Sequence, residues 1–162
     1  MPKTVTINPP KEGDVLFNIE EKVFPDIKAN EGDKAYIFMH TVPFEGSVGL
    51  VNMLTATRLQ RKGFELSFIL YGPAVLMASA ARGYPSVGAE GFPGNLGYNR
   101  QIKTLLDEGA KVYSCRFAMG ALYGMREDDL IPGVKAVNPL DILDINLQAY
   151  RERALVLSTW TL

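Results

Sequence analysis

The sequence has little of what most metal and disulfide sites need. It contains one cysteine, Cys115, and one histidine, His40. One cysteine forms no internal disulfide, which suits the reducing cytoplasm. One cysteine and one histidine also fall short of the usual ligand set of a zinc site. We therefore expect a cytoplasmic protein without a metal site.

Neither sign of charge is in excess. Lysine and arginine total 17 and aspartate and glutamate total 18, so the formal net charge is −1. This balance argues against nucleic-acid binding, which needs a basic surface. No apolar run reaches the about 18 residues of a membrane span, and MPKTVTINPPKEGD at the start lacks the apolar core of a signal peptide. The glycine patterns that hold phosphates and the GxSxG elbow are missing too, so we expect no cofactor.

The regular part of the chain is an alternation of apolar runs and helical patterns. We divide the sequence into an N-terminal arm, residues 1–32, rich in proline and glycine, and one α/β domain, residues 33–162. Strands are expected at 34–42, 64–72, 111–115, 133–137 and 154–160, and helices at 47–63, 73–82, 95–109, 117–125 and 138–152. Nearly continuous apolar strands are typical of parallel sheets. The sequence therefore predicts a three-layer α/β sandwich with a five-stranded, mostly parallel sheet in the flavodoxin-like order 2-1-3-4-5.

This topology predicts where a ligand binds. In open parallel sheets the site lies beyond the carboxyl ends of the strands, where the strand order reverses. With the order 2-1-3-4-5 that point lies between the first strand, which ends in His40-Thr41, and the third, which ends in Cys115-Arg116. We expect the lone histidine and the lone cysteine on the same rim.

Two interpretations of Cys115 stay open. A cysteine just before a helix lies at the positive end of the helix dipole, which favours the thiolate, and Arg116 adds a positive charge if its side chain turns to the cleft. Free cysteine is also among the most buried residue types, so Cys115 equally fits a core position. His40 has the same ambiguity, because strand alternation places it on one face with Tyr36 and Phe38. Residues 83–94 are either a surface connection or a lid.

Several short segments resemble one known family. A cysteine at a strand end, a small-residue helix from Ala118 to Gly124 and LIPGVKAV at 130–137 resemble the DsrE/DsrF-like family of sulfur-relay proteins, over residues 34–160. More narrowly, YGPAVLMA, GAEGFPGNLGYN and SCRFAMGALYGM resemble a DsrE-like branch associated with the bacterial nitrogen-starvation response. The resemblance implies a DsrE-like fold, assembly into a homotrimer or homohexamer, and Cys115 as the position of a persulfide. Tyr123-Gly124 stands where relay proteins often have arginine-glycine.

Three functions follow from these observations. We favour a small-ligand-binding or regulatory module with a cleft around Cys115, to which Gly72 and the aromatic walls Tyr71, Phe92 and Tyr98 contribute. The second is a sulfur-relay protein that carries a persulfide on Cys115 and exchanges it with another relay protein. The third is a structural subunit of a larger assembly. We also expect the apolar residues of the arm to stabilise a homo-oligomer.

Overall fold

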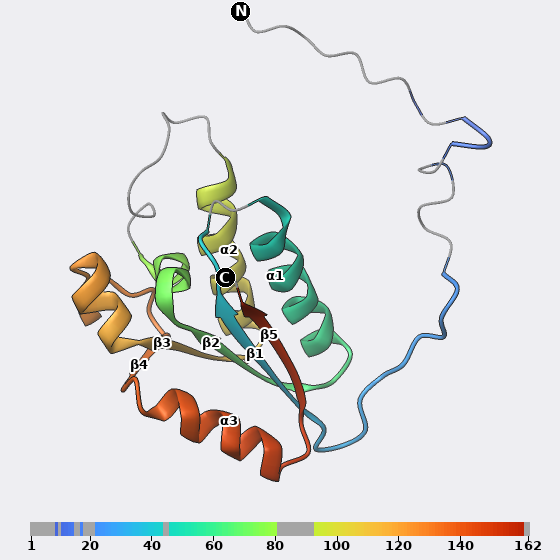
Figure 1. Cartoon of the computed structure of the whole chain (residues 1–162). Helices are drawn as coiled ribbons and strands as arrows, with labels where there is room; N and C mark the ends of the chain where they lie inside the picture. Colours follow the sequence, from blue (N-terminus) through green and yellow to red (C-terminus); the bar gives the residue numbers. More distant parts are fainter. Residues whose placement is uncertain are drawn as a thin grey trace, which may run out of the picture.

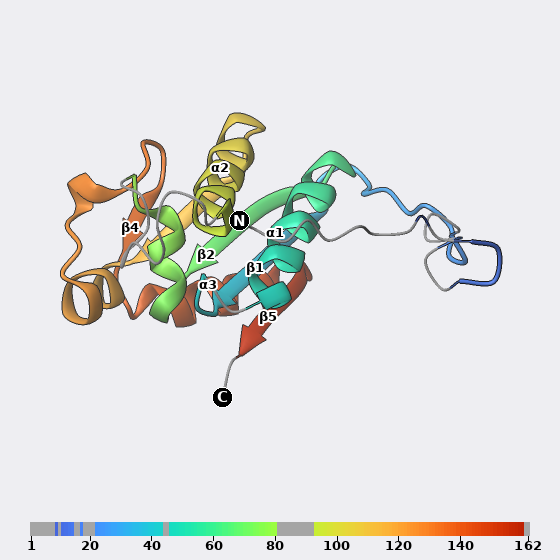
Figure 2. The ribbon, with the colours of Figure 1, turned by 90° about the horizontal axis from the view of Figure 1, so that it is seen from above.

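Five parallel strands form one sheet, and helices cover both of its faces (Figures 1 and 2). The computed structural model describes residues 9, 11–14, 17, 22–43, 46–80 and 93–160. The strands are β1 Lys34–His40, β2 Glu65–Leu70, β3 Lys111–Cys115, β4 Lys135–Val137 and β5 Leu155–Trp160. The helical segments are α1 Gly46–Arg61, η1 Gly72–Ala78, α2 Pro93–Asp107, η2 Ala118–Leu122, η3 Glu127–Asp129 and α3 Asp141–Arg151. The predicted α/β class and the parallel sheet are confirmed.

The two faces of the sheet are set by the alternation of side chains along β1 and β2. Ile37 and Phe68 are register partners and belong to the larger apolar core, which includes residues of α1, α2, η1 and η2. Tyr36 and Phe38 point to the other face, where they pack with Ile69 of β2 and Ala149 of α3. The predicted shared face of Tyr36 and Phe38 is therefore confirmed, and α3 lies opposite α1 and α2 (Figure 1).

The expected strand order is wrong. The sheet runs β4-β3-β2-β1-β5 instead of the flavodoxin-like 2-1-3-4-5. Connections between parallel strands are right-handed. The face of the sheet that a connecting helix covers therefore decides on which side of the first strand the next strand lies. The connections through α1, α2 and η2 use one face, so the chain moves steadily from β1 to β4, and α3 on the other face returns it to β5 beside β1. Apolar periodicity predicts helices but does not say which face each one covers.

The segment after β3 differs from the regular helix expected at 117–125. The backbone becomes helical at Arg116 and is π-helical from Ala118 to Leu122. The helix expected at 73–82 is a shorter 3₁₀ segment, η1. An isolated antiparallel bridge joins Ser79 to Leu130, beside the hydrogen bond from the Ile131 N–H to the Ala78 carbonyl, 2.8 Å. Residues 83–92 of the expected loop lie outside the described residues.

The described end of the arm runs past the turn between α1 and β2. The Ala29 N–H donates to the Lys62 carbonyl at 2.9 Å, and the Lys62 ammonium contacts the Asp26 carboxylate and the Ile27 carbonyl. Val23 and Phe24 stay exposed. The division of the chain at residue 32 and the role of the arm in assembly stay predictions.

Candidate functional site

The carboxyl edge of the sheet holds two separate groups of predicted site residues. His40 ends β1 and Cys115 ends β3, but β2 lies between these strands and pairs with both. The expected meeting of β1 and β3 therefore does not occur, because it depended on the flavodoxin-like order. The point where the strand order reverses is instead at β1 and β5, whose last register pair is His40 with Trp160.

The first group is built around His40. Its ring lies 4.8 Å from the ring of Tyr71, centroid to centroid, at an interplanar angle of 48°. The backbone of Gly72 passes directly over this histidine, because a Cβ built on Gly72 would lie 2.4 Å from His40 Nε2. Gly72 also has a φ of +53°, in the left-handed region that favours glycine. These three residues therefore form a close-fitting cluster in which a side chain at position 72 would strain the backbone and displace the histidine ring.

Residues of β5 contact this cluster. The backbone N–H of His40 donates to Thr159 Oγ1 at 3.0 Å, and Thr159 belongs to β5. Burial raises the pKa of the Tyr71 hydroxyl, and a hydrogen bond with the Ser158 side chain acts in the opposite direction. No sequence pattern predicted β5 at this position, since the expected strand order put β5 at the far side of the sheet. His40 and Tyr71 are both half-buried, so each keeps some surface toward solvent.

Two further predicted site residues, Thr41 and Tyr98, do not join an open cluster. Thr41 is fully buried. Tyr98 is buried as well, and it packs against α1, where a Cβ on Gly49 would lie 2.8 Å from its hydroxyl oxygen. Tyr98 therefore occupies the interior between α1 and α2. Phe92 lies outside the described residues.

The second group surrounds Cys115. Its side chain is 5% exposed and belongs to the larger apolar core, together with Val112, Ala118 and Met119. The thiol is therefore buried, which fits the second of the two interpretations, a core position, because the helical segment that follows β3 packs its first turn onto the same core. Arg116 forms an ion pair with Glu127, and both side chains are about half exposed. This pairing directs the guanidinium to Glu127 at the surface.

A polar network that the sequence did not predict lies at the amino edge of the sheet. Lys34 Nζ is 2.8 Å from Glu152 Oε1, and the Tyr36 hydroxyl donates to Glu152 Oε2 at 2.7 Å. The Lys34 ammonium, followed by hydrogen bonds from Tyr36 and Gln148, holds the pKa of the Glu152 carboxyl at about 2. Burial, helped by the Glu152 charge, raises the pKa of Tyr36 above its usual range. Alternation alone places Lys34 and Tyr36 on one face, but no pattern links them to Glu152.

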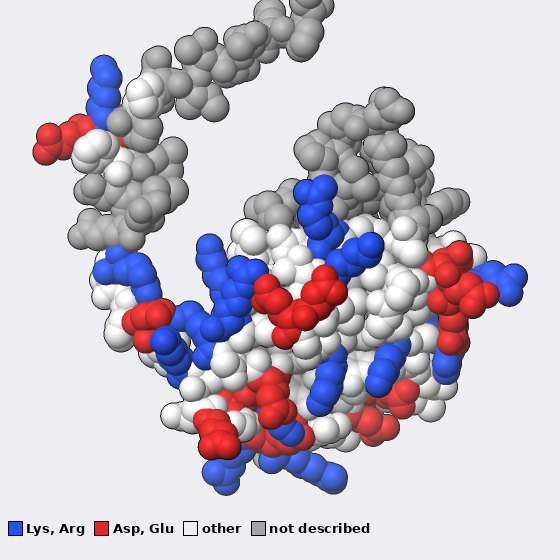
Figure 3. Space-filling view, turned by 180° about the vertical axis from the view of Figure 1, so that it is seen from behind, with Lys and Arg blue, Asp and Glu red and all other residues white. Residues whose placement is uncertain are grey.

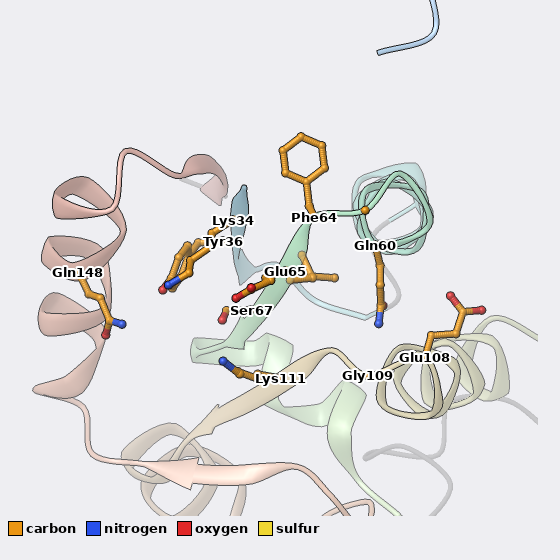
Figure 4. Close-up of a pocket in the computed structure, with 12 residues that line it drawn as sticks. Lys34, Tyr36, Gln60, Phe64, Glu65, Ser67, Glu108, Gly109, Lys111 and Gln148 are labelled. Atoms are coloured by element: carbon orange, nitrogen blue, oxygen red, sulfur yellow. The ribbon is translucent and has the colours of Figure 1, made fainter. Parts of the chain in front are cut away.

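This network borders a cavity of about 440 Å³ (Figure 4). Gln148 reaches the cavity from α3, and Gln60 and Glu108 reach it from the α1 and α2 side. Lys34 and Lys111 are balanced by Glu65 and Glu108, so the lining carries no surplus of either sign. This balance suits a polar cavity between the two helix layers, and it gives the cavity no preference for an anion or a cation.

Charges of both signs are mixed on one face of the molecule, and the described residues form no metal cluster. Basic and acidic side chains are interspersed on the face that Figure 3 shows. Among the described residues, no three or more of histidine, cysteine, aspartate and glutamate gather as a metal site. The helices in that same part of the chain are all too short or too polar to cross a bilayer.

Comparisons with known proteins show the fold. No family model and no curated protein matches the chain. The crystal structure of the YchN protein from E. coli matches 78% of this chain and 99% of its own, with a TM-score of 0.62 and 18% sequence identity. A protein of unknown function from Methanobacterium thermoautotrophicum, MTH1491, matches 78% of this chain and all of its own, with a TM-score of 0.57 and 18% identity. The chain therefore has a fold of the DsrE/YchN type.

Proposed function

We propose that this protein binds a small ligand at the carboxyl edge of β1 and β5 and acts as a regulatory module. The burial of Cys115 carries this choice, because a persulfide carrier must present its sulfur to a donor and an acceptor. A thiol that is 5% exposed within an apolar cluster presents it to neither. His40 and Tyr71 are only half-buried, so these two predicted site residues keep some access to solvent.

The position and chemistry of the His40 cluster support a binding role. It lies where the strand order reverses, which is where open parallel sheets bind ligands. The imidazole of His40 and the phenol of Tyr71, the latter hydrogen-bonded with the Ser158 side chain, provide hydrogen-bonding groups beside an aromatic surface. Gly72 leaves room for the histidine and brings backbone close to it.

The finer assignment rests on the sequence resemblance. We place the protein in the DsrE-like branch associated with the nitrogen-starvation response, on the basis of YGPAVLMA, GAEGFPGNLGYN and SCRFAMGALYGM. In that setting the bound molecule is a small metabolite whose concentration changes with nitrogen supply. We further propose that the protein assembles with itself, as a homotrimer or homohexamer.

The single histidine makes the binding proposal directly measurable. The imidazole of His40 gives one set of ring resonances in an NMR spectrum of the full chain. We would add glutamine, glutamate, 2-oxoglutarate, urea, AMP and ATP separately at millimolar concentration. At least one should shift the His40 resonances in a saturable way, and His40→Ala should weaken that binding at least about tenfold.

Cys115→Ala is the matched control. It removes a buried sulfur from the other group and should leave the affinity unchanged. A ligand that binds in the native protein but loses affinity only in Cys115→Ala would contradict the proposed site. If none of the six compounds moved the His40 resonances, the proposal of a nitrogen-linked ligand at this edge would be wrong.

A further inference from the structure

An apolar stripe runs along the outer side of α3. Leu140, Leu143, Leu147 and Tyr150 are 77%, 64%, 48% and 81% exposed. Their spacing of three, four and three residues places them on one side of a helix, in the pattern of a helix-pairing seam. Exposed leucines that occur singly need no explanation, but a continuous stripe marks an interaction surface.

The stripe is distinct from the side of α3 that contacts the sheet. Ile142, Ile145 and Ala149 pack against the cores, and Ala149 is completely buried. At 100° per residue, these three positions lie on nearly the opposite side of the helix from Leu143 and Leu147. The fold of one chain therefore uses one apolar side of α3 and leaves a second one uncovered.

Two opposite charges flank the stripe on the same side. Asp144 and Arg151 border a shallow hollow together with Leu147 and Gln148. In the part of the chain that the structure describes, neither Asp144 nor Arg151 forms an ion pair. The acidic residue lies near the start of α3 and the basic one at its end.

This charge order selects an antiparallel partner. When two copies of α3 run in opposite directions, Leu143 of each faces Leu147 of the other, and Leu140 faces Tyr150. Side chains lean toward the start of their own helix, so Asp144 of one copy and Arg151 of the other lean toward each other. The same contact forms twice about a two-fold axis. In a parallel pair, each of the two flanking charged residues would instead face a neutral residue of the other copy. That residue would be a proline or an asparagine.

We propose that the stripe is the contact surface for a second copy of this chain, paired antiparallel through α3. The pairing is isologous, and it goes beyond the ligand site because it uses the outer side of α3, which includes neither His40 nor Tyr71. A two-fold contact is incompatible with a simple homotrimer and compatible with a homohexamer that has two-fold axes. The proposal therefore selects an assembly with an even number of copies.

Sedimentation of the full-length protein at roughly 50 µM, well above the dissociation constant expected of a stable pair, tests this proposal. We expect an even number of copies. The double variant Leu143→Asp, Leu147→Asp should form an assembly of half the mass, with an unchanged circular dichroism spectrum because both leucines are exposed. Leu122→Asp on η2, where the leucine is 57% exposed, is the control and should keep the original mass.

The charge pair tests the direction of the helices. Asp144→Arg alone and Arg151→Asp alone should each weaken the assembly about tenfold, because they place like charges together. The two changes combined should restore it. An odd number of copies, an unchanged mass in the double leucine variant, or failure of the combined charge exchange to restore assembly would overturn the proposal. None of these outcomes depends on ligand binding at His40.

Discussion

The two faces of the sheet differ in what they bury. The face under α1 and α2 is closed by apolar side chains such as Ile37, Met39 and Phe68, all fully buried. The face under α3 has a small apolar cluster around Phe38 and, beside it, the charged network of Lys34, Tyr36 and Glu152. The first face supplies most of the burial that stabilises the fold, while the second combines modest burial with polar and exposed positions. We infer that the face under α1 and α2 mainly stabilises the fold, and that the face under α3 mainly provides surface for contact with other molecules.

The largest expected effect is on the apolar face. Phe68→Ala removes a fully buried ring from the centre of the larger core. We expect the free energy of unfolding to fall by about 3–5 kcal/mol in a urea titration. Phe24→Ala removes the same atoms from a side chain that is 81% exposed, and it should change the free energy by less than about 0.5 kcal/mol. Similar costs for both substitutions would contradict the role of Phe68 in the larger core.

The next effect concerns the close contact in the His40 cluster. Gly72→Ala introduces a Cβ at a positive φ and 2.4 Å from the histidine ring. We expect a loss of about 2–3 kcal/mol together with displaced His40 resonances. Gly124→Ala is matched, since its φ is +61° but no atom lies within 4 Å of the new Cβ, and it should lose only about 1–2 kcal/mol. Equal losses would mean that the histidine is not held against Gly72.

A smaller effect separates the polar network from an ordinary surface ion pair. Glu152→Gln keeps the shape of the side chain and removes the charge that Lys34 and Tyr36 contact. We expect a loss of about 1–2 kcal/mol at pH 7, discounted for the solvent that reaches the carboxylate. Glu108→Gln removes a carboxylate whose partner Arg61 is mostly exposed, and its effect on the free energy of unfolding should be clearly smaller.

The pH dependence of the same variant sharpens this test. The pKa of Glu152 is lowered to about 2 in the folded protein, from 4.5 as its ordinary value. A lowered carboxyl pKa stabilises the fold above the unfolded value, and this contribution is lost as the pH falls toward the folded value. The difference in unfolding free energy between wild type and Glu152→Gln should therefore be constant above pH 5 and shrink between pH 5 and 2. A difference that grew on acidification would refute the network.

The sequence predicted the elements better than their arrangement. The apolar runs of β1, β2 and β3 identified strands to within one or two residues, because a buried parallel strand needs a continuous apolar run. The order of the strands depends on which face each helix covers, and helical periodicity carries no such information. For that reason His40 and Cys115 were expected to meet, although β2 separates them. The bond between Tyr36 and Glu152 joins residues at opposite ends of the domain, and no local pattern predicts it.

The reactivity of Cys115 tests the central claim most directly. We would measure the rate of alkylation of this single thiol by iodoacetamide at pH 8, in the native protein and in denaturant. Because Cys115 is 5% exposed and packed in the larger core, alkylation of the native protein should wait for local opening and be at least about a hundredfold slower than in denaturant. A native rate close to the denatured rate would show an accessible thiol. It would contradict the assignment of Cys115 to the core and favour the alternative sulfur-relay function.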